Sequence, residues 1–98
     1  MEHRLDNRRP VSIAGRLYLG DEGVSCRITE LSQGGLRVRS PVASHTRLFE
    51  VIAIEFTDAK DDETHLLRGM VVHAEGNELG LMFIHVSHDA LNRLSLAA

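Results

Sequence analysis

Apolar residues alternate with polar ones in short segments of this chain, and glycine-containing turns separate the segments. Every second residue of 24–29 is apolar, and the same alternation returns in residues 36–39. A period of two is the spacing of side chains on one face of a β-strand, so each segment predicts a strand with one buried face. The chain is therefore restricted to folds in which antiparallel strands share a core.

Four further segments predict strands, at residues 11–19, 48–57, 65–74 and 78–86. Residues 20–23 and 75–77 contain the glycine and asparagine that tight hairpins use. Residues 87–96 open with a serine suited to cap a helix and then place leucines near helical spacing. We expect an all-β (mainly) fold, a small six-stranded antiparallel β-barrel with a short C-terminal helix, because closing the sheet removes exposed strand edges.

The length of 98 residues fits one domain that builds its own core. We assign that domain to residues 10–98 and expect residues 1–9, which lack an apolar pattern, to form a flexible N-terminal arm. The single cysteine, Cys26, excludes an internal disulfide. The polar N-terminus does not resemble a signal peptide, and no apolar run is long enough to span a bilayer. We expect a cytoplasmic protein without membrane insertion.

Arginines are concentrated in the arm, where Arg4 and Arg8 lie four residues apart and Arg9 follows directly. A guanidinium group is planar, permanently charged and able to donate two parallel hydrogen bonds. It therefore suits phosphate oxygens and the O6/N7 edge of guanine. The alternative interpretation of these arginines is a solvated polar tail.

The alternation of the strands breaks at residues 30–32, and the glycine pair Gly34 and Gly35 restores it. This predicts a bulge or sharp turn. Glu30 and Ser32 carry oxygens that accept hydrogen bonds from the N1–H and exocyclic amine of guanine, and a turn that presents backbone N–H groups favours anions. An ordinary turn is the alternative, and Glu30 is equally suited to a salt bridge that holds the arm.

Charged side chains continue beyond this turn. Arg37 and Arg39 lie on the outer face of the next predicted strand, and we interpret them as solvated charges, with a role in lining a pocket as the alternative.

The two elements, in this order, resemble the signature of the PilZ domain family, R-x-x-x-R followed by [D/N]-x-S-x-x-G. The first reads Arg4 to Arg8 here, and the second reads Glu30-x-Ser32-x-x-Gly35, with glutamate where the family has Asp or Asn. Residues 10–17 are similar to the first strand of the family and residues 69–83 to its closing hairpin. The resemblance therefore covers nearly the whole chain.

The resemblance implies a receptor that binds the bacterial second messenger cyclic di-GMP without covalent chemistry and needs no cofactor. The implied ligand-binding residues are Arg4, Arg8, Arg9, Glu30, Ser32, Gly34 and Gly35. Since no output domain is attached, we expect the signal to pass in trans to an unidentified effector protein, and the receptor to be a monomer or weak homodimer. The alternative, favoured by the longer side chain of Glu30, is an adaptor that does not bind nucleotide and acts through protein contacts.

Other classes of function find little support in the residues. The histidines His73, His85 and His88 do not follow a known metal-ligand spacing, and Cys26 is on the inward face of a strand. No catalytic triad or phosphate-loop motif is present, so we expect neither an enzyme nor a metal site. The net charge of −3 and an aromatic content of 4% argue against binding of a nucleic-acid polymer, which favours a basic surface and stacking side chains.

Overall fold

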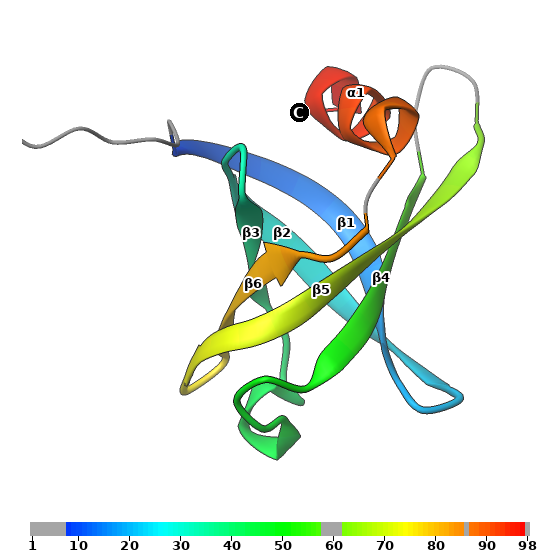
Figure 1. Cartoon of the computed structure of the whole chain (residues 1–98). Coiled ribbons are helices and arrows are strands. Elements are labelled where there is room, and N and C mark those ends of the chain that lie inside the picture. Colours follow the sequence, from blue (N-terminus) through cyan, green and yellow to red (C-terminus); the bar gives the residue numbers. More distant parts are fainter. Residues whose placement is uncertain (1–7, 58–61, 86, 98) are drawn as a thin grey trace, which may run out of the picture.

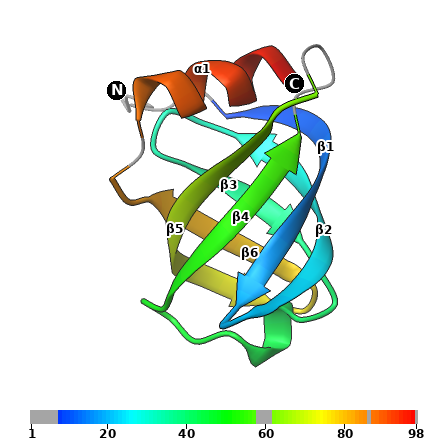
Figure 2. The same ribbon diagram turned by 90° about the vertical axis from the view of Figure 1, so that its right-hand side faces the viewer.

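The computed structural model describes residues 8–57, 62–85 and 87–97, and within them six strands form a closed antiparallel barrel with a helix at one end (Figures 1 and 2). The strands are β1 (Arg9–Leu19), β2 (Glu22–Leu31), β3 (Gly35–Arg39), β4 (Val51–Thr57), β5 (Thr64–Glu75) and β6 (Glu78–Phe83). The helices are η1 (Ala43–His45) and α1 (His88–Ala97). The predicted fold is confirmed.

The strands follow one another around the barrel in the order β1-β2-β3-β6-β5-β4, and β4 closes the ring against β1. Closure is made by the second half of β1, where Gly15 pairs with Phe56 and Tyr18 pairs with Ala53. Because β3 neighbours β6, residues more than forty positions apart in the chain lie side by side on the barrel wall.

Two hairpins use the turns that the sequence predicts. Gly20 and Asp21 connect β1 to β2, and Gly76 and Asn77 connect β5 to β6. The first residue of each turn is a glycine with positive φ, 64° for Gly20 and 60° for Gly76. A residue with a side chain is strained in that conformation, so glycine fits both turns.

The barrel interior is filled by the alternate residues that the period of two selects. Seven of the predicted inward residues of β2, β3 and β4 are buried, namely Cys26, Ile28, Leu36, Val38, Ile52, Ile54 and Phe56, whereas Val24 of β2 is only partly buried. Helix α1 lies across one open end (Figure 2) and buries Leu94 completely. The backbone N–H of Ala90 donates to the Ser87 side chain at 3.1 Å, which confirms the predicted N-cap.

Two of the strands, β4 and β6, are shorter than predicted. β4 begins at Val51 rather than at residue 48, because Phe49 adopts a left-handed backbone with φ of 72°, and both Leu48 and Phe49 are exposed. β6 ends at Phe83, shortly before His85, whose φ of 49° is also left-handed. A residue with left-handed backbone interrupts an extended strand, and neither phenylalanine nor histidine indicates such a conformation in a sequence.

The N-terminal arm is only partly described. Residues 1–7, including Arg4, lie outside the described residues, and Arg9 already belongs to β1, where it pairs with Leu31. No helix in the described part of the chain is long and apolar enough to cross a membrane.

Candidate functional site

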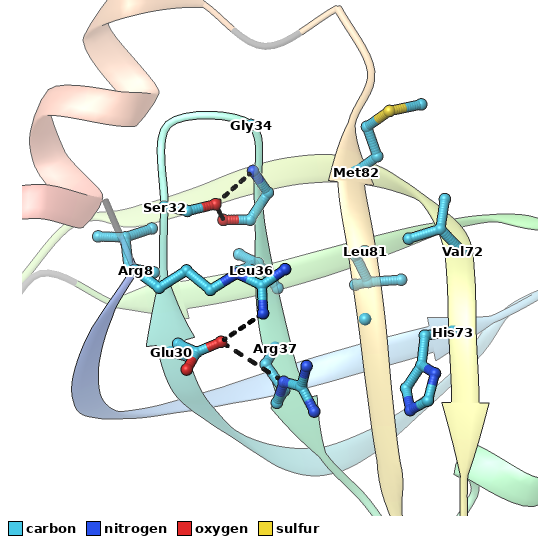
Figure 3. A pocket seen from close by; sticks show the side chains of 13 residues that line it. Arg8, Glu30, Ser32, Gly34, Leu36, Arg37, Val72, His73, Leu81 and Met82 are labelled. Carbon is cyan, nitrogen blue, oxygen red and sulfur yellow. Dashed lines mark hydrogen bonds and ion pairs between the residues drawn. The ribbon is translucent and has the colours of Figure 1, made fainter. Parts of the chain in front are cut away.

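An open hollow of about 290 Å³ lies on the outer wall of the barrel, where β2, β3, β6 and β5 run side by side (Figure 3). Arg8 and the turn between β2 and β3 form one side of it, and side chains from β5 and β6 form the other. The lining residues are Arg8, Glu30, Leu31, Ser32, Gly34, Gly35, Leu36, Arg37, Val72, His73, Gly80, Leu81 and Met82.

Two glycines on the outer face of the barrel leave this hollow open. Gly35 of β3 pairs with Met82, while Gly80 of β6 pairs with Arg37 on one side and His73 on the other. Without side chains at these positions, nothing from Gly80 fills the space between Arg37 and His73. At Gly35 the strands also approach closely, since an added Cβ would overlap the backbone carbonyl oxygen of Leu81.

A bulge in β2 brings Glu30 to the outer face. Cys26 and Ile28 point inward, so strict alternation would also turn Glu30 into the core. The register between β2 and β3 shifts between Ile28 and Glu30, and Glu30 then lies directly opposite Arg37. A carboxylate that would be costly inside the barrel thereby reaches a cation on its surface.

A second bulge, in β5, turns two consecutive residues toward the hollow. The register between β5 and β6 shifts between Val71 and His73. Val71 is fully buried, whereas Val72 and His73 are both exposed and both line the hollow. Val72 and Met82 therefore give the far side of the hollow an apolar wall, as Figure 3 shows.

Charged side chains of alternating sign run along the edge of the hollow. One oxygen of Glu30 lies 4.0 Å from Nη1 of Arg8 and 3.5 Å from Nε of Arg37. Oε1 of Glu78 lies 3.2 Å from Nη1 of Arg37, and its Oε2 lies 3.3 Å from Nη2 of Arg39. The hydrogen bond from Arg37, followed by that from Arg39, lowers the pKa of Glu78 below its usual value. Two guanidinium groups thus face the hollow with one carboxylate between them.

The turn between β2 and β3 is held by its own hydrogen bonds. The Ser32 hydroxyl accepts from the N–H of Gly35 and donates to the Gly35 carbonyl, both at 3.1 Å. The carbonyl of Gly34 accepts from the N–H of Phe83 at 2.9 Å, which ties the turn to the end of β6. The predicted sharp turn is confirmed, and its structural role is compatible with ligand binding by the same residues.

Five of the predicted site residues line one hollow, and Arg9 does not. The residues brought together are Arg8, Glu30, Ser32, Gly34 and Gly35, while Arg4 lies outside the described residues. Nη2 of Arg9 instead donates to the carbonyl and hydroxyl oxygens of Ser95 in α1, at 3.2 and 3.0 Å. Arg9 lines a separate groove of about 540 Å³ between the β2–β3 turn and the helix.

The sequence prediction missed the far half of the hollow, including Val72, His73, Gly80 and Met82, and it favoured a solvated role for Arg37. The alternation of β3 does place Arg37 on the same face as Gly35. Its position opposite Glu30, however, depends on the β2 bulge, and the contribution of β5 depends on the second bulge.

Two observations on the described residues concern metal binding and thiol chemistry. No group of three or more His, Cys, Asp or Glu side chains there is placed to hold a metal ion. Burial raises the pKa of the Cys26 thiol to about 11, so the thiol stays protonated and unreactive at neutral pH.

Comparison with known proteins gives one informative result. A search of curated proteins finds no significant match. The family model of the PilZ domain matches residues 2–97, a span that contains both sequence elements and every strand of the barrel. Because the match covers almost the entire chain, the protein belongs to the PilZ domain family.

Proposed function

We propose that the hollow binds cyclic di-GMP and that the protein is a receptor for this second messenger. The observation that carries the proposal is the convergence of Arg8 and the turn from Glu30 to Gly35 on one hollow. Membership of the PilZ family, which typically binds cyclic di-GMP, supports it. The family is also generally non-catalytic, in keeping with a binding function.

The chemistry of the hollow suits the parts of this ligand. The guanidinium of Arg8 offers paired donors to a phosphate, and Arg4, four residues earlier, supplies a second guanidinium in this proposal. The Ser32 hydroxyl presents an oxygen to the donor edge of guanine. The apolar wall of Val72 and Met82 suits the flat face of a base, since a nucleobase stacks on apolar surface.

Arg8→Ala tests the site assignment. Removing this guanidinium should abolish binding of cyclic di-GMP in titration calorimetry. The melting temperature of the ligand-free protein should hardly change, because Arg8 is half exposed and its ion pair with Glu30 is long, at 4.0 Å. Arg16→Ala is the matched control: it removes an exposed arginine whose hydrogen bond goes to the carbonyl of Gly23, away from the hollow. Unaltered affinity in Arg8→Ala would refute the assignment.

The second candidate function is an adaptor that acts through protein contacts without nucleotide. It is favoured by Glu30, whose carboxylate engages both Arg8 and Arg37. A thermal shift with cyclic di-GMP separates the two functions. A ligand at one hundred times its dissociation constant stabilises a protein by about 2.7 kcal/mol, which a melting curve detects readily. The absence of any shift at high ligand concentration would favour the adaptor.

In both functions the output is a contact with a partner protein. For the receptor, we infer that the bound dinucleotide and the arm together form a surface that the partner recognises in trans. A pull-down with and without cyclic di-GMP distinguishes the two: the receptor should retain its partner only with the ligand, and the adaptor equally in both conditions.

A further inference from the structure

We propose that Arg37 is a further ligand-binding residue and that Glu30 acts as an internal anion, which a phosphate of the ligand displaces from Arg8 and Arg37. The inference rests on the proposed function and assigns two residues of the same site their roles. In it, Glu30 is a competitor of the ligand and not one of its contacts.

The position of Arg37 in the sheet supports its role as a ligand-binding residue. Arg37 lies opposite Glu30 on one side and opposite Gly80 on the other, and its side chain is 32% exposed. Because Gly80 has no side chain, the guanidinium borders the open floor of the hollow. Figure 3 shows Arg8 and Arg37 approaching the same carboxylate from two directions. An anion that replaced this carboxylate would meet both cations.

The distances around Glu30 support its displacement by a phosphate of the ligand. A single oxygen of Glu30 serves both cations, at 3.5 and 4.0 Å, whereas charge-assisted hydrogen bonds are about 2.7–2.9 Å long. The Glu30 side chain is 33% exposed, so water solvates it once it is displaced. A phosphate offers more oxygens than the one that Glu30 uses, and it can satisfy each guanidinium separately. Exchange of the carboxylate for a phosphate therefore replaces loose ion pairs with closer ones.

Glu78 holds Arg37 in place during this exchange. It accepts from Nη1 of Arg37 at 3.2 Å, while a guanidinium carries five N–H donors. Arg37 can therefore bind a phosphate without leaving Glu78. Arg39 contacts the same Glu78 at 3.3 Å but does not line the hollow, so it does not share the proposed role.

Glu30→Gln distinguishes a competitor from a contact. Glutamine keeps the length of the side chain and one carbonyl acceptor, but it removes the charge that holds Arg8 and Arg37. In titration calorimetry with cyclic di-GMP we expect the affinity to rise about fivefold, the size of effect that loss of an exposed ion pair permits. An affinity that falls or stays the same would overturn the role assigned to Glu30.

Arg37→Gln, compared with Arg39→Gln, tests the direct contact. Both variants remove one positive charge from the outer face of β3 and one hydrogen bond to Glu78. We expect Arg37→Gln to weaken binding roughly tenfold, as loss of a charged hydrogen-bond partner does, and Arg39→Gln to weaken it less than about twofold. Equal losses in two variants with similar melting temperatures would show a general charge effect and overturn the assignment of Arg37.

The outcomes separate this inference from the proposed function. If the wild-type protein binds cyclic di-GMP and Glu30→Gln binds no tighter, only the inference fails. If the ligand binds Glu30→Gln but not the wild-type protein, the internal anion is upheld and the proposed function fails for the native chain. If neither protein binds, both fail together.

Discussion

Gly35 combines two tasks at one residue. It lets β3 approach β6 so closely that a Cβ would overlap the Leu81 carbonyl oxygen, and it lines the hollow beside the turn. Glu30 is a second notable position, because its side chain is one methylene longer than that of aspartate and its carboxylate lies 4.0 Å from Arg8 and 3.5 Å from Arg37. At the residue scale, the site therefore depends on the missing side chain of Gly35 as well as on the carboxylate of Glu30.

Replacing Gly35 with alanine should therefore destabilise the barrel. The obstructing atom belongs to the backbone of a paired strand and cannot move aside, so we expect a loss of roughly 3 kcal/mol in the free energy of unfolding, measured by urea denaturation. Gly20→Ala is the control, because no atom lies within 4 Å of its added Cβ. There only the left-handed backbone is strained, at a cost of about 1 kcal/mol. A smaller loss for Gly35→Ala than for Gly20→Ala would contradict the steric argument.

Among the elements, helix α1 has a clear structural task. It covers one end of the barrel and inserts Leu94 into the core. The guanidinium of Arg9 in β1 donates a hydrogen bond to Ser95 of this helix. The helix is ten residues long, too short to be stable alone in water, so its attachment must come from packing. Arg9, expected at the ligand, is here part of that attachment.

Leu94→Ala should weaken the whole domain by about 2–4 kcal/mol, because it leaves a cavity under the helix. Leu96→Ala, two residues further along the same helix, removes the same atoms from a side chain that is 59% exposed. It should change stability by less than about 0.5 kcal/mol. Thermal denaturation followed by circular dichroism compares the two variants, and similar losses would argue that α1 does not close the barrel.

At the scale of the whole molecule, five charged side chains form a row, namely Arg8, Glu30, Arg37, Glu78 and Arg39. This row crosses β2, β3 and β6 and links strands that are distant in sequence. Glu78 is the member whose pKa is lowered, by hydrogen bonds from Arg37 and then Arg39. A carboxyl group with a lowered pKa in the folded state stabilises that state above its unfolded pKa, near 4.5. This contribution is lost as the pH falls through the folded pKa.

Glu78→Gln should accordingly be less stable than the wild-type protein at neutral pH, and the difference should shrink once the pH falls below about 4.5. Urea denaturation across a pH series measures this. Glu22→Gln, at the β1–β2 turn, removes the same charge without touching the row and is the control. A difference that persists unchanged in acid would mean that Glu78 contributes by packing rather than by charge.

Much of the architecture could be predicted from local sequence. The period of two identified the inward residues of β2 to β4, and glycine positions identified both hairpin turns. The turn from Glu30 to Gly35 was found in the same way. The break in alternation at Glu30 predicted a bulge or sharp turn, and the β2 bulge lies directly before it. The β5 bulge could not be found, since its extra residue, Val72, has no distinctive chemistry. The meeting of Arg37 with Gly80 was also hidden, because only the order of the strands in the folded sheet brings β3 beside β6.

Strand β1 is held unevenly along its length, and this has a mechanical consequence. Its residues 15–18 are bonded on both flanks, to β2 and β4, whereas β4 does not pair with residues 9–14 in the described part of the chain. Antiparallel hydrogen bonds lie perpendicular to the strand, so tension that lifts Arg8 away from β2 would break them one after another. Gly15 is where such peeling stops, because the load is then shared with β4. A force applied at the N-terminus would thus unzip the first half of β1 and leave the rest of the barrel wall intact.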